Sequence, residues 1–336
     1  MGFDKENIVI LPIPDNQPSK IKTLKSEFLN VPGVQDVTLC YAPPAHESAS
    51  SGSITYGSRA EQEKFQISFR AADDNFVPFF KLKIIAGRNV LPSDTVREFL
   101  VNQSTVKMLG LKTNEEVLGK PATINGYKGT IVGVVNDFHN KSFHVAIEPL
   151  AITTFFIWYE RVAVKIDAAN MNGTLSQLQT KWDRTFPNNM YKYEFLNERI
   201  KNLYETDTRM MTLVQVFTVI AIFIACMSLY GLVSFMAAQK TREIAVRKVL
   251  GASAQSIILL FATEFGSLMM IAFVIATPLG WYIMHYWLQN FAYQIEISAD
   301  IFILSLLITT IIVMFTVGYR SIMTALADPS KSLRAD

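Results

Sequence analysis

Three long stretches without a charged side chain fill the second part of this 336-residue chain. They are Met210–Gln239, Phe265–Ile295 and Ile301–Tyr319. A helix crosses a hydrocarbon core of about 30 Å with about 20 apolar residues, so each stretch is long enough. One such stretch could be a buried core helix, but three within the last 127 residues favour membrane helices. We predict an all-α transmembrane domain at 206–336, with spans at about 210–239, 265–288 and 301–319.

The charged residues predict a second, extramembrane domain. Residues 1–209 hold 47 of the 60 Asp, Glu, Lys and Arg side chains, and an apolar content of 50% argues against a disordered chain. The loop after the first span is basic, the tail adds Arg320, Lys331 and Arg334, and the second connection holds only Glu296 and Asp300. By the positive-inside rule, the basic loop and the C-terminus are cytoplasmic, and residues 1–205 are extracytoplasmic.

This orientation requires that a domain of about 200 residues crosses the membrane. Residues 1–15 have no basic segment followed by an apolar stretch and a cleavage site. We therefore expect that the chain is the C-terminal half of a longer protein whose preceding helix exports the domain. A truncated gene product is the alternative.

Both ends of the extracytoplasmic domain show the same β-α-β pattern. The first unit has strands at Asn7–Ile13 and Val34–Tyr41 around a helix capped by Ser19, and the second has Arg161–Asp167, a helix at Gly173–Phe186, and Tyr191–Leu196. This repetition predicts an α+β domain in two parts, in which both ends build one subdomain and residues of about 60–150 form an inserted subdomain.

Within and before the insert, local patterns predict further elements. Ala42–Ser58 is rich in Ser, Pro and Gly and predicts a mobile loop. The expected strands are Phe65–Phe69, Ala122–Ile124 and Gly129–Val135, the last two around the turn Asn125-Gly126, and the expected helices are Asp73–Lys81 and Asn102–Leu109.

A continuous stalk is expected where the extracytoplasmic domain meets the first span. Asn197 can cap a helix whose apolar stripe runs into that span and consists of Ile200, Leu203, Tyr204 and Met211. A helix over Glu198–Ala238 would be roughly 60 Å long, about twice the hydrocarbon thickness. Pro278 lies inside the second span and is expected to kink it.

The motifs of common catalytic sites are absent from the sequence. It contains no phosphate-binding loop, no H-E-x-x-H, no C-x-x-C and no G-x-S-x-G, which predicts a non-enzymatic chain without a cofactor. His139 and His144 lack the spaced partners of a metal site, so we expect none. Cys40 and Cys226 fall in different domains and are not expected to pair. Glu264, at the edge of a span, is interpreted as an interfacial carboxylate.

The basic loop after the first span has the pattern of a short amphipathic helix. In Lys240–Ala252 (KTREIAVRKVLGA), apolar residues group on one side, Glu243 and Arg247 form an i,i+4 pair, and Gly251 can end the helix. Such a helix either sets the topology by touching lipid headgroups or docks into a groove on a cytoplasmic motor. The spacing alone leaves both open.

Several motifs together resemble those of MacB/FtsX-type ABC transporter permeases. Thr241–Ser253 (TREIAVRKVLGAS) resembles their cytoplasmic coupling segment, and Asp328–Arg334 (DPSKSLR) is similar to their terminal N-P-x-x-S-L-R pattern. Ala86-Gly87-Arg88, Leu118-Gly119-Lys120, Ile131–Phe138 and Ile147-Glu148-Pro149 resemble the MacB-like periplasmic core. Family members carry a transmembrane helix before this core, which agrees with the expected missing segment.

The resemblance implies a permease of the bacterial inner membrane that transmits the motion of a separate ATPase to the extracytoplasmic domain for export or efflux. The coupling helix would comprise Arg242, Glu243, Ile244, Arg247, Lys248, Val249, Leu250, Gly251 and Ala252, and the C-terminal cytoplasmic motif Pro329, Ser332, Leu333 and Arg334. The implied partners are an ABC ATPase subunit, a second permease subunit or the missing N-terminal half, a periplasmic adaptor with an outer-membrane channel, and membrane lipid. An FtsX-like signalling or scaffold protein that regulates a cell-wall hydrolase or a sensor kinase is the alternative.

Overall fold

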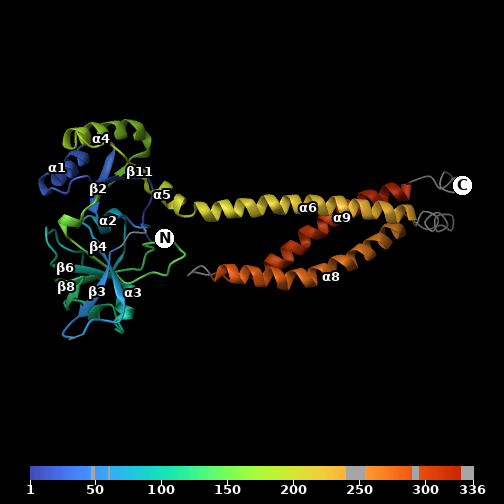
Figure 1. Ribbon diagram of the computed structural model, residues 1–336, viewed down its shortest axis with the longest axis horizontal. Coiled ribbons are helices and arrows are strands. Elements are labelled where there is room, and N and C mark those ends of the chain that lie inside the picture. Colours follow the sequence, from blue (N-terminus) through green and yellow to red (C-terminus); the bar gives the residue numbers. More distant parts are fainter. Residues whose placement is uncertain (47–49, 60, 240–253, 290–294, 327–336) are drawn as a thin grey trace. The chain divides into compact units, whose positions relative to one another are not determined.

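The chain forms two compact units, Met1–Glu205 and Thr206–Asp336. The computed structural model describes residues 1–46, 50–59, 61–239, 254–289 and 295–326 (Figure 1). The first unit is a mixture of helices and strands, and the second is helical in its described part. The predicted fold class, an α+β domain plus three transmembrane-type helices, is confirmed.

The two ends of the first unit build one four-stranded antiparallel sheet in the order β11-β1-β10-β2. Its elements are β1 (Ile8–Pro12), α1 (Pro18–Leu29), β2 (Val34–Cys40), β10 (Arg161–Ile166), α4 (Met171–Thr185) and β11 (Glu194–Phe195). We call this sheet with its two helices the terminal subdomain. The predicted pair of β-α-β units is confirmed, and together they form a split β-α-β arrangement.

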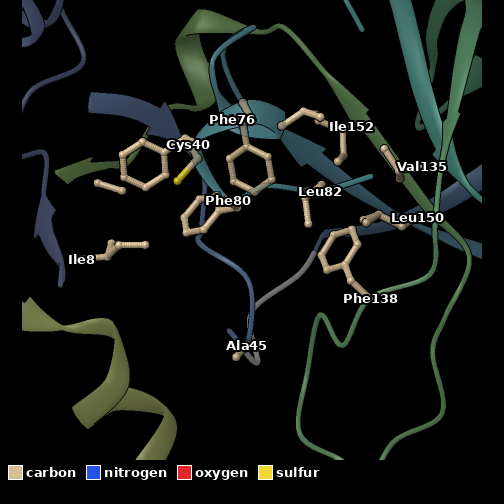
Figure 2. Packing of buried hydrophobic residues seen from close by; sticks show 14 of the residues in the cluster. Ile8, Cys40, Ala45, Phe76, Phe80, Leu82, Val135, Phe138, Leu150 and Ile152 are labelled. Carbon is tan, nitrogen blue, oxygen red and sulfur yellow. The ribbon is translucent and has the colours of Figure 1, made fainter. Parts of the chain in front are cut away.

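The sheet of the terminal subdomain is buried on both faces. Val9 and Leu11 of β1 pack with the apolar stripes of α1 and α4, which lie together on one side of the sheet (Figure 1). Ile8 and Ile10 point to the other face, because successive side chains of a strand alternate. There they meet residues of the insert, including Phe76, Phe80, Leu82 and Leu150 (Figure 2). One strand therefore joins two cores.

Helix and strand ends differ from the prediction in small ways. Helix α1 begins at Pro18 with Gln17 at its N-cap, so Ser19 is not the cap. Proline is favoured in this first turn because its missing N–H has no partner there anyway. Strand β11 is only two residues long, within the predicted Tyr191–Leu196. Asn197 lies inside the first turn of the following helix, whose N-cap is Phe195.

The insert is organised around a closed ring of six strands. Its strands are β3 (Ser50–Tyr56), β4 (Gln66–Ala71), β6 (Glu98–Asn102), β7 (Pro121–Ile124), β8 (Tyr127–Val135) and β9 (Leu150–Thr153). They pair in the order β8-β6-β9-β4-β3-β7, and β7 pairs with β8 to close the ring, which we call the barrel. Strand β5 (Ile84–Gly87) adds to β8 outside the ring. Alternate residues of the ring strands, such as Ile54, Phe69 and Phe99, fill the interior of the barrel.

The predicted mobile loop at Ala42–Ser58 is wrong, because it contains β3. Gly52, Ile54 and Tyr56 alternate inward and are buried, between β4 and β7. Before the strand, the Arg70 guanidinium is buried and its Nη1 donates to the carbonyls of Ala42 (2.8 Å) and Pro43 (2.5 Å). Burial lowers the pKa of Arg70 to about 10. This loop is anchored by contacts that its own composition does not reveal.

The remaining short elements connect these strands. They are the helices α2 (Phe76–Phe79) and α3 (Gln103–Met108) and the 3₁₀ turns η1 (Glu115–Val117), η2 (Phe156–Trp158) and η3 (Ala168–Asn170). Helix α2 is shorter than the predicted Asp73–Lys81, since Pro78 cannot donate a backbone hydrogen bond and the chain turns at Lys81, where φ is 52°. The Asn125-Gly126 turn is confirmed, with φ of 51° and 83°.

The predicted continuous stalk helix is wrong at Tyr204. Helix α5 (Leu196–Leu203) ends there, and α6 (Glu205–Gln239) begins at the next residue. Tyr204 has φ −109° and ψ 13°, and its N–H bonds to the carbonyl of Lys201 at 3.1 Å, three residues back instead of four. The break therefore comes from a tightened last turn of α5.

In its described part, the second unit contains three helices that are long and apolar enough to cross a membrane. They are α6, α8 (Ala254–Leu288) and α9 (Ala299–Leu326), with candidate spans Glu205–Met236, Phe265–Leu288 and Ala299–Thr316. Val233 of α6 and Phe265 of α8 are buried in one small apolar cluster, and Val313 of α9 packs against it. Many of the described apolar side chains elsewhere on these helices are exposed, as expected of surfaces that face lipid.

Candidate functional site

The residues predicted to couple to an ATPase lie outside the described residues. This holds for Arg242, Glu243, Ile244, Arg247, Lys248, Val249, Leu250, Gly251 and Ala252, and also for Pro329, Ser332, Leu333 and Arg334. The described chain fixes only their flanks: α6 ends at Gln239 and α8 begins at Ala254. Residues 240–253 thus lie between two membrane-type helices in the chain.

Pro278 lies inside α8, which remains helical on both sides of it and curves along its length (Figure 1). A proline has no N–H to donate, so the carbonyl four residues earlier, that of Val274, loses its helical partner. The neighbouring Thr277 hydroxyl is buried and has no hydrogen-bond partner in the described part of the chain. The kink itself stays a prediction.

Where the first unit ends, Tyr204 contacts the connection between β8 and β9, residues 136–149. The Tyr204 hydroxyl oxygen accepts a hydrogen bond from the backbone N–H of Phe143 at 3.0 Å. The Tyr204 ring lies 6.0 Å from the Phe143 ring and 6.5 Å from the His144 ring. Phe143 in turn lies 4.1 Å from the His139 ring. We call this group the junction cluster.

The two ends of this connection are fixed to the barrel by hydrogen bonds. At one end, the Asp137 carboxylate accepts from the N–H (2.9 Å) and the hydroxyl (2.8 Å) of Ser104, at the start of α3. At the other end, Glu148 accepts from the Ser68 hydroxyl at 3.0 Å and from Lys141 at 2.8 Å. The side chain of Asn102 donates to the Glu148 carbonyl at 2.9 Å.

These contacts explain two of the motifs that carry the family resemblance. Asp137 and Phe138 end the stretch Ile131–Phe138, and Glu148 is the centre of Ile147-Glu148-Pro149. Phe138 is buried in the core between the subdomains (Figure 2). The motif residues therefore hold the connection in place.

The motif Ala86-Gly87-Arg88 has a structural role as well. A Cβ atom on Gly87 would lie 2.3 Å from the Val132 carbonyl oxygen, so only glycine fits, at a φ of 71°. Arg88 makes two hydrogen bonds to the Glu98 carboxylate, at 2.8 and 2.5 Å. In Leu118-Gly119-Lys120, Gly119 has a φ of 72° and donates its N–H to the Ile131 carbonyl.

A cavity of about 310 Å³ lies where α1 meets the insert. Lys25 of α1 contacts the Asp73 carboxylate at 2.6 Å, and Lys22 contacts Asp94 at 3.0 Å. Asp73 also accepts from the Thr38 hydroxyl and the Leu39 N–H, at 2.5 and 3.0 Å. Burial raises the pKa of Asp73, although Lys25 and these hydrogen bonds act against it. Lys22 and Lys25 of α1 are thus paired with Asp94 and Asp73, which makes the cavity a contact between the subdomains.

Metal and thiol chemistry find no support in the described residues. No group of three or more His, Cys, Asp or Glu side chains there could hold a metal ion. His139 and His144 lie against the aromatic rings of the junction cluster, and burial lowers the pKa of His139. Cys40 is fully buried, and burial raises the pKa of its thiol to about 12, which makes it a poor nucleophile.

Sequence reasoning did not find the junction cluster. Tyr204 was expected on the apolar stripe of a continuous helix, and Phe143 had no assigned role. The signal was the spacing of aromatic and histidine residues in His139–His144 (HNKSFH), but nothing local indicates that Tyr204, about 60 residues later, packs against them. Such a contact requires the fold.

Comparison with solved structures gave neighbours of the first unit. The periplasmic region of MacB from Actinobacillus actinomycetemcomitans aligns with 17% identity and a TM-score of 0.43, over 60% of this chain and 94% of that one. The extracellular domain of the noncanonic ABC-type transporter YknZ from Gram-positive bacteria aligns with 17% identity and a TM-score of 0.40, over 56% and 97%. A domain of a permease protein from Porphyromonas gingivalis aligns with 15% identity and a TM-score of 0.37, over 54% of this chain and 85% of that one.

Sequence comparisons addressed the second unit. No curated protein matched the chain. A family model, the FtsX-like permease C-terminal family, matches residues 215–327. This range takes in most of α6 and all of α8 and α9. The part of the chain that holds the three membrane-capable helices therefore matches the FtsX-like permease C-terminal family, as the motifs of the sequence indicated.

Proposed function

We propose that the chain is the permease subunit of an ABC exporter and transmits ATP-driven motion to its extracytoplasmic domain. The match of residues 215–327 to the FtsX-like permease C-terminal family carries this proposal. It is supported by three membrane-capable helices that follow an α+β unit of about 200 residues. No solute pore through the helices is required, because the work is done on a substrate outside the membrane.

The ATPase binds the segment Lys240–Ala252 in this proposal. Arg242, Glu243, Arg247 and Lys248 supply polar contacts, and Ile244, Val249 and Leu250 supply apolar anchoring. Ala252 lies on the apolar side, and Gly251 can end the helix. The segment joins α6 to α8 directly, so a force on it acts on both helices at once. The tail with Pro329, Ser332, Leu333 and Arg334 lies on the same, cytoplasmic side.

ATP is bound and hydrolysed by the partner subunit, since this sequence has no phosphate-binding loop. The chain sits in the bacterial inner membrane with residues 1–205 extracytoplasmic. A second permease subunit, or an N-terminal half, completes the membrane part. A periplasmic adaptor and an outer-membrane channel carry the substrate onward.

Charge reversal in the coupling segment tests this proposal. In R247E/K248E, two cations that face the ATPase become anions, and like-charge repulsion at the contact is expected to abolish stimulation of ATP hydrolysis. The measurement is the ATP hydrolysis rate of the partner ABC ATPase, reconstituted with this chain in nanodiscs.

The matched control is K112E, which reverses an exposed charge on the insert and leaves stimulation intact. Membrane insertion of all variants is checked by resistance to alkaline extraction. Equal stimulation by R247E/K248E and the unchanged chain would contradict the assignment of the coupling segment.

A further inference from the structure

Two structural routes lead from the start of α6 into the first unit. The first runs through α5, which directly precedes α6 in the chain except for Tyr204. Leu196 and Ile200 of α5 are buried in the same core as Ile8 and Ile10 of β1. Helix α5 is therefore attached to the core that the sheet of the terminal subdomain shares with the insert.

The second route is the side chain of Tyr204, which reaches the insert. Its hydroxyl oxygen accepts the Phe143 N–H at 3.0 Å, and its ring lies over Phe143 and His144. Tyr204 is also the residue at which the helix breaks, and it directly precedes Glu205, the first residue of α6. A displacement of the start of α6 therefore acts on Tyr204 through the chain itself.

The segment that Tyr204 holds is stiffly connected to the barrel. Its ends are bonded to Ser104, Ser68 and Asn102, which belong to three different elements of the insert. Leu150 directly follows this segment, and its N–H donates to the side chains of Asn102 and Thr105. Both of these side chains are buried. Between the ends, Lys141 pairs with Glu148 at 2.8 Å and the Asn140 carbonyl accepts the His46 N–H at 3.1 Å. A pull at Phe143 is thus passed to β8 and β9.

We infer that Tyr204 is the positioning residue that links movement of the first membrane helix to the barrel, through its hydrogen bond to Phe143 in the β8–β9 connection. This inference rests on the proposed function, because it needs an ATP-driven displacement of α6. It assigns the insert, rather than the terminal subdomain, as the part that responds to Tyr204. The break in the helix contributes to this link, because Tyr204 lies outside both helices and its hydroxyl contacts Phe143.

The variant Tyr204→Phe tests the inference, since it removes only the hydroxyl and keeps the ring contacts. The readout is hydrogen exchange of the full chain, reconstituted with its ABC ATPase in nanodiscs, with and without trapped ATP. In the unchanged chain, ATP is expected to alter exchange in residues 136–149. In Tyr204→Phe, this ATP-dependent change is lost, and exchange at Phe143 rises roughly five-fold in both states, as the loss of one hydrogen bond implies.

Tyr193→Phe is the matched control, because it removes a hydroxyl from a half-exposed tyrosine of the terminal subdomain. It leaves the ATP-dependent change in residues 136–149 as it is. A change that persists in Tyr204→Phe would overturn the inference while leaving the proposed function in place. If ATP alters exchange nowhere in residues 1–205 of the unchanged chain, the proposed function fails and the inference falls with it.

Discussion

Asn102 shows how a single buried side chain holds the β8–β9 connection. Its Oδ1 accepts from the N–H and hydroxyl of Thr105 (3.1 and 2.7 Å) and from the Leu150 N–H (2.9 Å), while its amide donates to the Glu148 carbonyl. It is 1% exposed, so water cannot replace these bonds. Four hydrogen bonds on one buried amide make it a structural centre of the insert.

Asn102→Ala is therefore expected to destabilise the first unit by about 3 kcal/mol, since buried N–H groups lose their acceptor. Urea unfolding of the full chain in detergent, followed by the fluorescence of Trp158 and Trp182 with Trp281 and Trp287 replaced by Phe, measures it. Lys107→Ala, on the exposed side of α3, serves as control and is expected to stay within about 0.5 kcal/mol. An unchanged midpoint for Asn102→Ala would show that the network contributes nothing.

Asp4 makes the N-terminal segment sensitive to acid. Burial alone would raise its pKa, but hydrogen bonds from Lys165 and Lys81, at 2.6 and 2.9 Å, hold the pKa well below the ordinary value of 3.8. A carboxyl group with a lowered pKa in the folded state stabilises the fold above its unfolded pKa. This contribution is lost as the pH falls through the folded pKa.

Asp4→Asn is thus expected to be less stable than the unchanged chain at pH 7, with a difference that is constant down to about pH 5 and shrinks below about pH 4. The free energy of unfolding at each pH gives the difference. Glu6→Gln, which removes an exposed carboxylate two residues away, is the control and shows no comparable loss at pH 7. A difference that does not shrink in acid would contradict the Lys165–Asp4–Lys81 pairing.

At the scale of elements, the close packing of β5 on β8 depends on glycine. A Cβ atom on Gly133 would lie 2.1 Å from the Arg88 carbonyl oxygen and 2.7 Å from a Leu100 methyl group. The end of β5 and the neighbouring β6 would have to move away from β8. Gly133→Ala is expected to cost about 3 kcal/mol in unfolding free energy, as overpacking of a core does.

Gly173→Ala in α4 is the matched control for this change. The three atoms nearest to its Cβ all belong to the Asn170 side chain, which can turn away, and alanine favours a helix, so the variant is expected to be neutral or slightly stabilising. The same urea unfolding experiment compares the two. Equal stabilities of both variants would mean that the strands yield without cost.

The elements that sequence patterns predicted are those with strong local signals. Helix α1 buries Ile21, Leu24 and Phe28 at helical spacing, and three long apolar runs can hardly be anything but membrane-type helices. Strand β3 (SSGSITY) was missed because small polar residues resemble a loop, and its burial depends on β4 and β7. Strands β6 and β9 are short apolar runs whose partners lie far away in the chain.

Of the candidate site, the sequence predicted the coupling segment but not the junction cluster. The coupling segment came from resemblance to a family, and its residues lie outside the described part of the chain. The junction cluster could not be predicted, because it joins Tyr204 to a connection about 60 residues away through a hydrogen bond to backbone. Periodicity describes one element at a time and does not report such contacts.

At the scale of the whole chain, the two units divide the proposed task. Residues 215–327 of the second unit match the FtsX-like permease C-terminal family, and the proposed coupling segment lies between α6 and α8 in the chain. The first unit is built so that its ends and its insert meet in one core, and both are attached at the residues just before α6. An ATP-driven movement of α6 would therefore reach both subdomains, one through α5 and the other through Tyr204.

The most direct test of this account asks whether ATP binding to the partner changes hydrogen exchange in residues 1–205, and whether this change requires the coupling segment. Hydrogen exchange across these residues is compared with and without trapped ATP, in the complex of the unchanged chain and in that of R247E/K248E. The account predicts an ATP-dependent change in the unchanged chain that disappears in R247E/K248E, although both insert into the membrane. Identical exchange with and without ATP in the unchanged chain, beside an active ATPase, would contradict it.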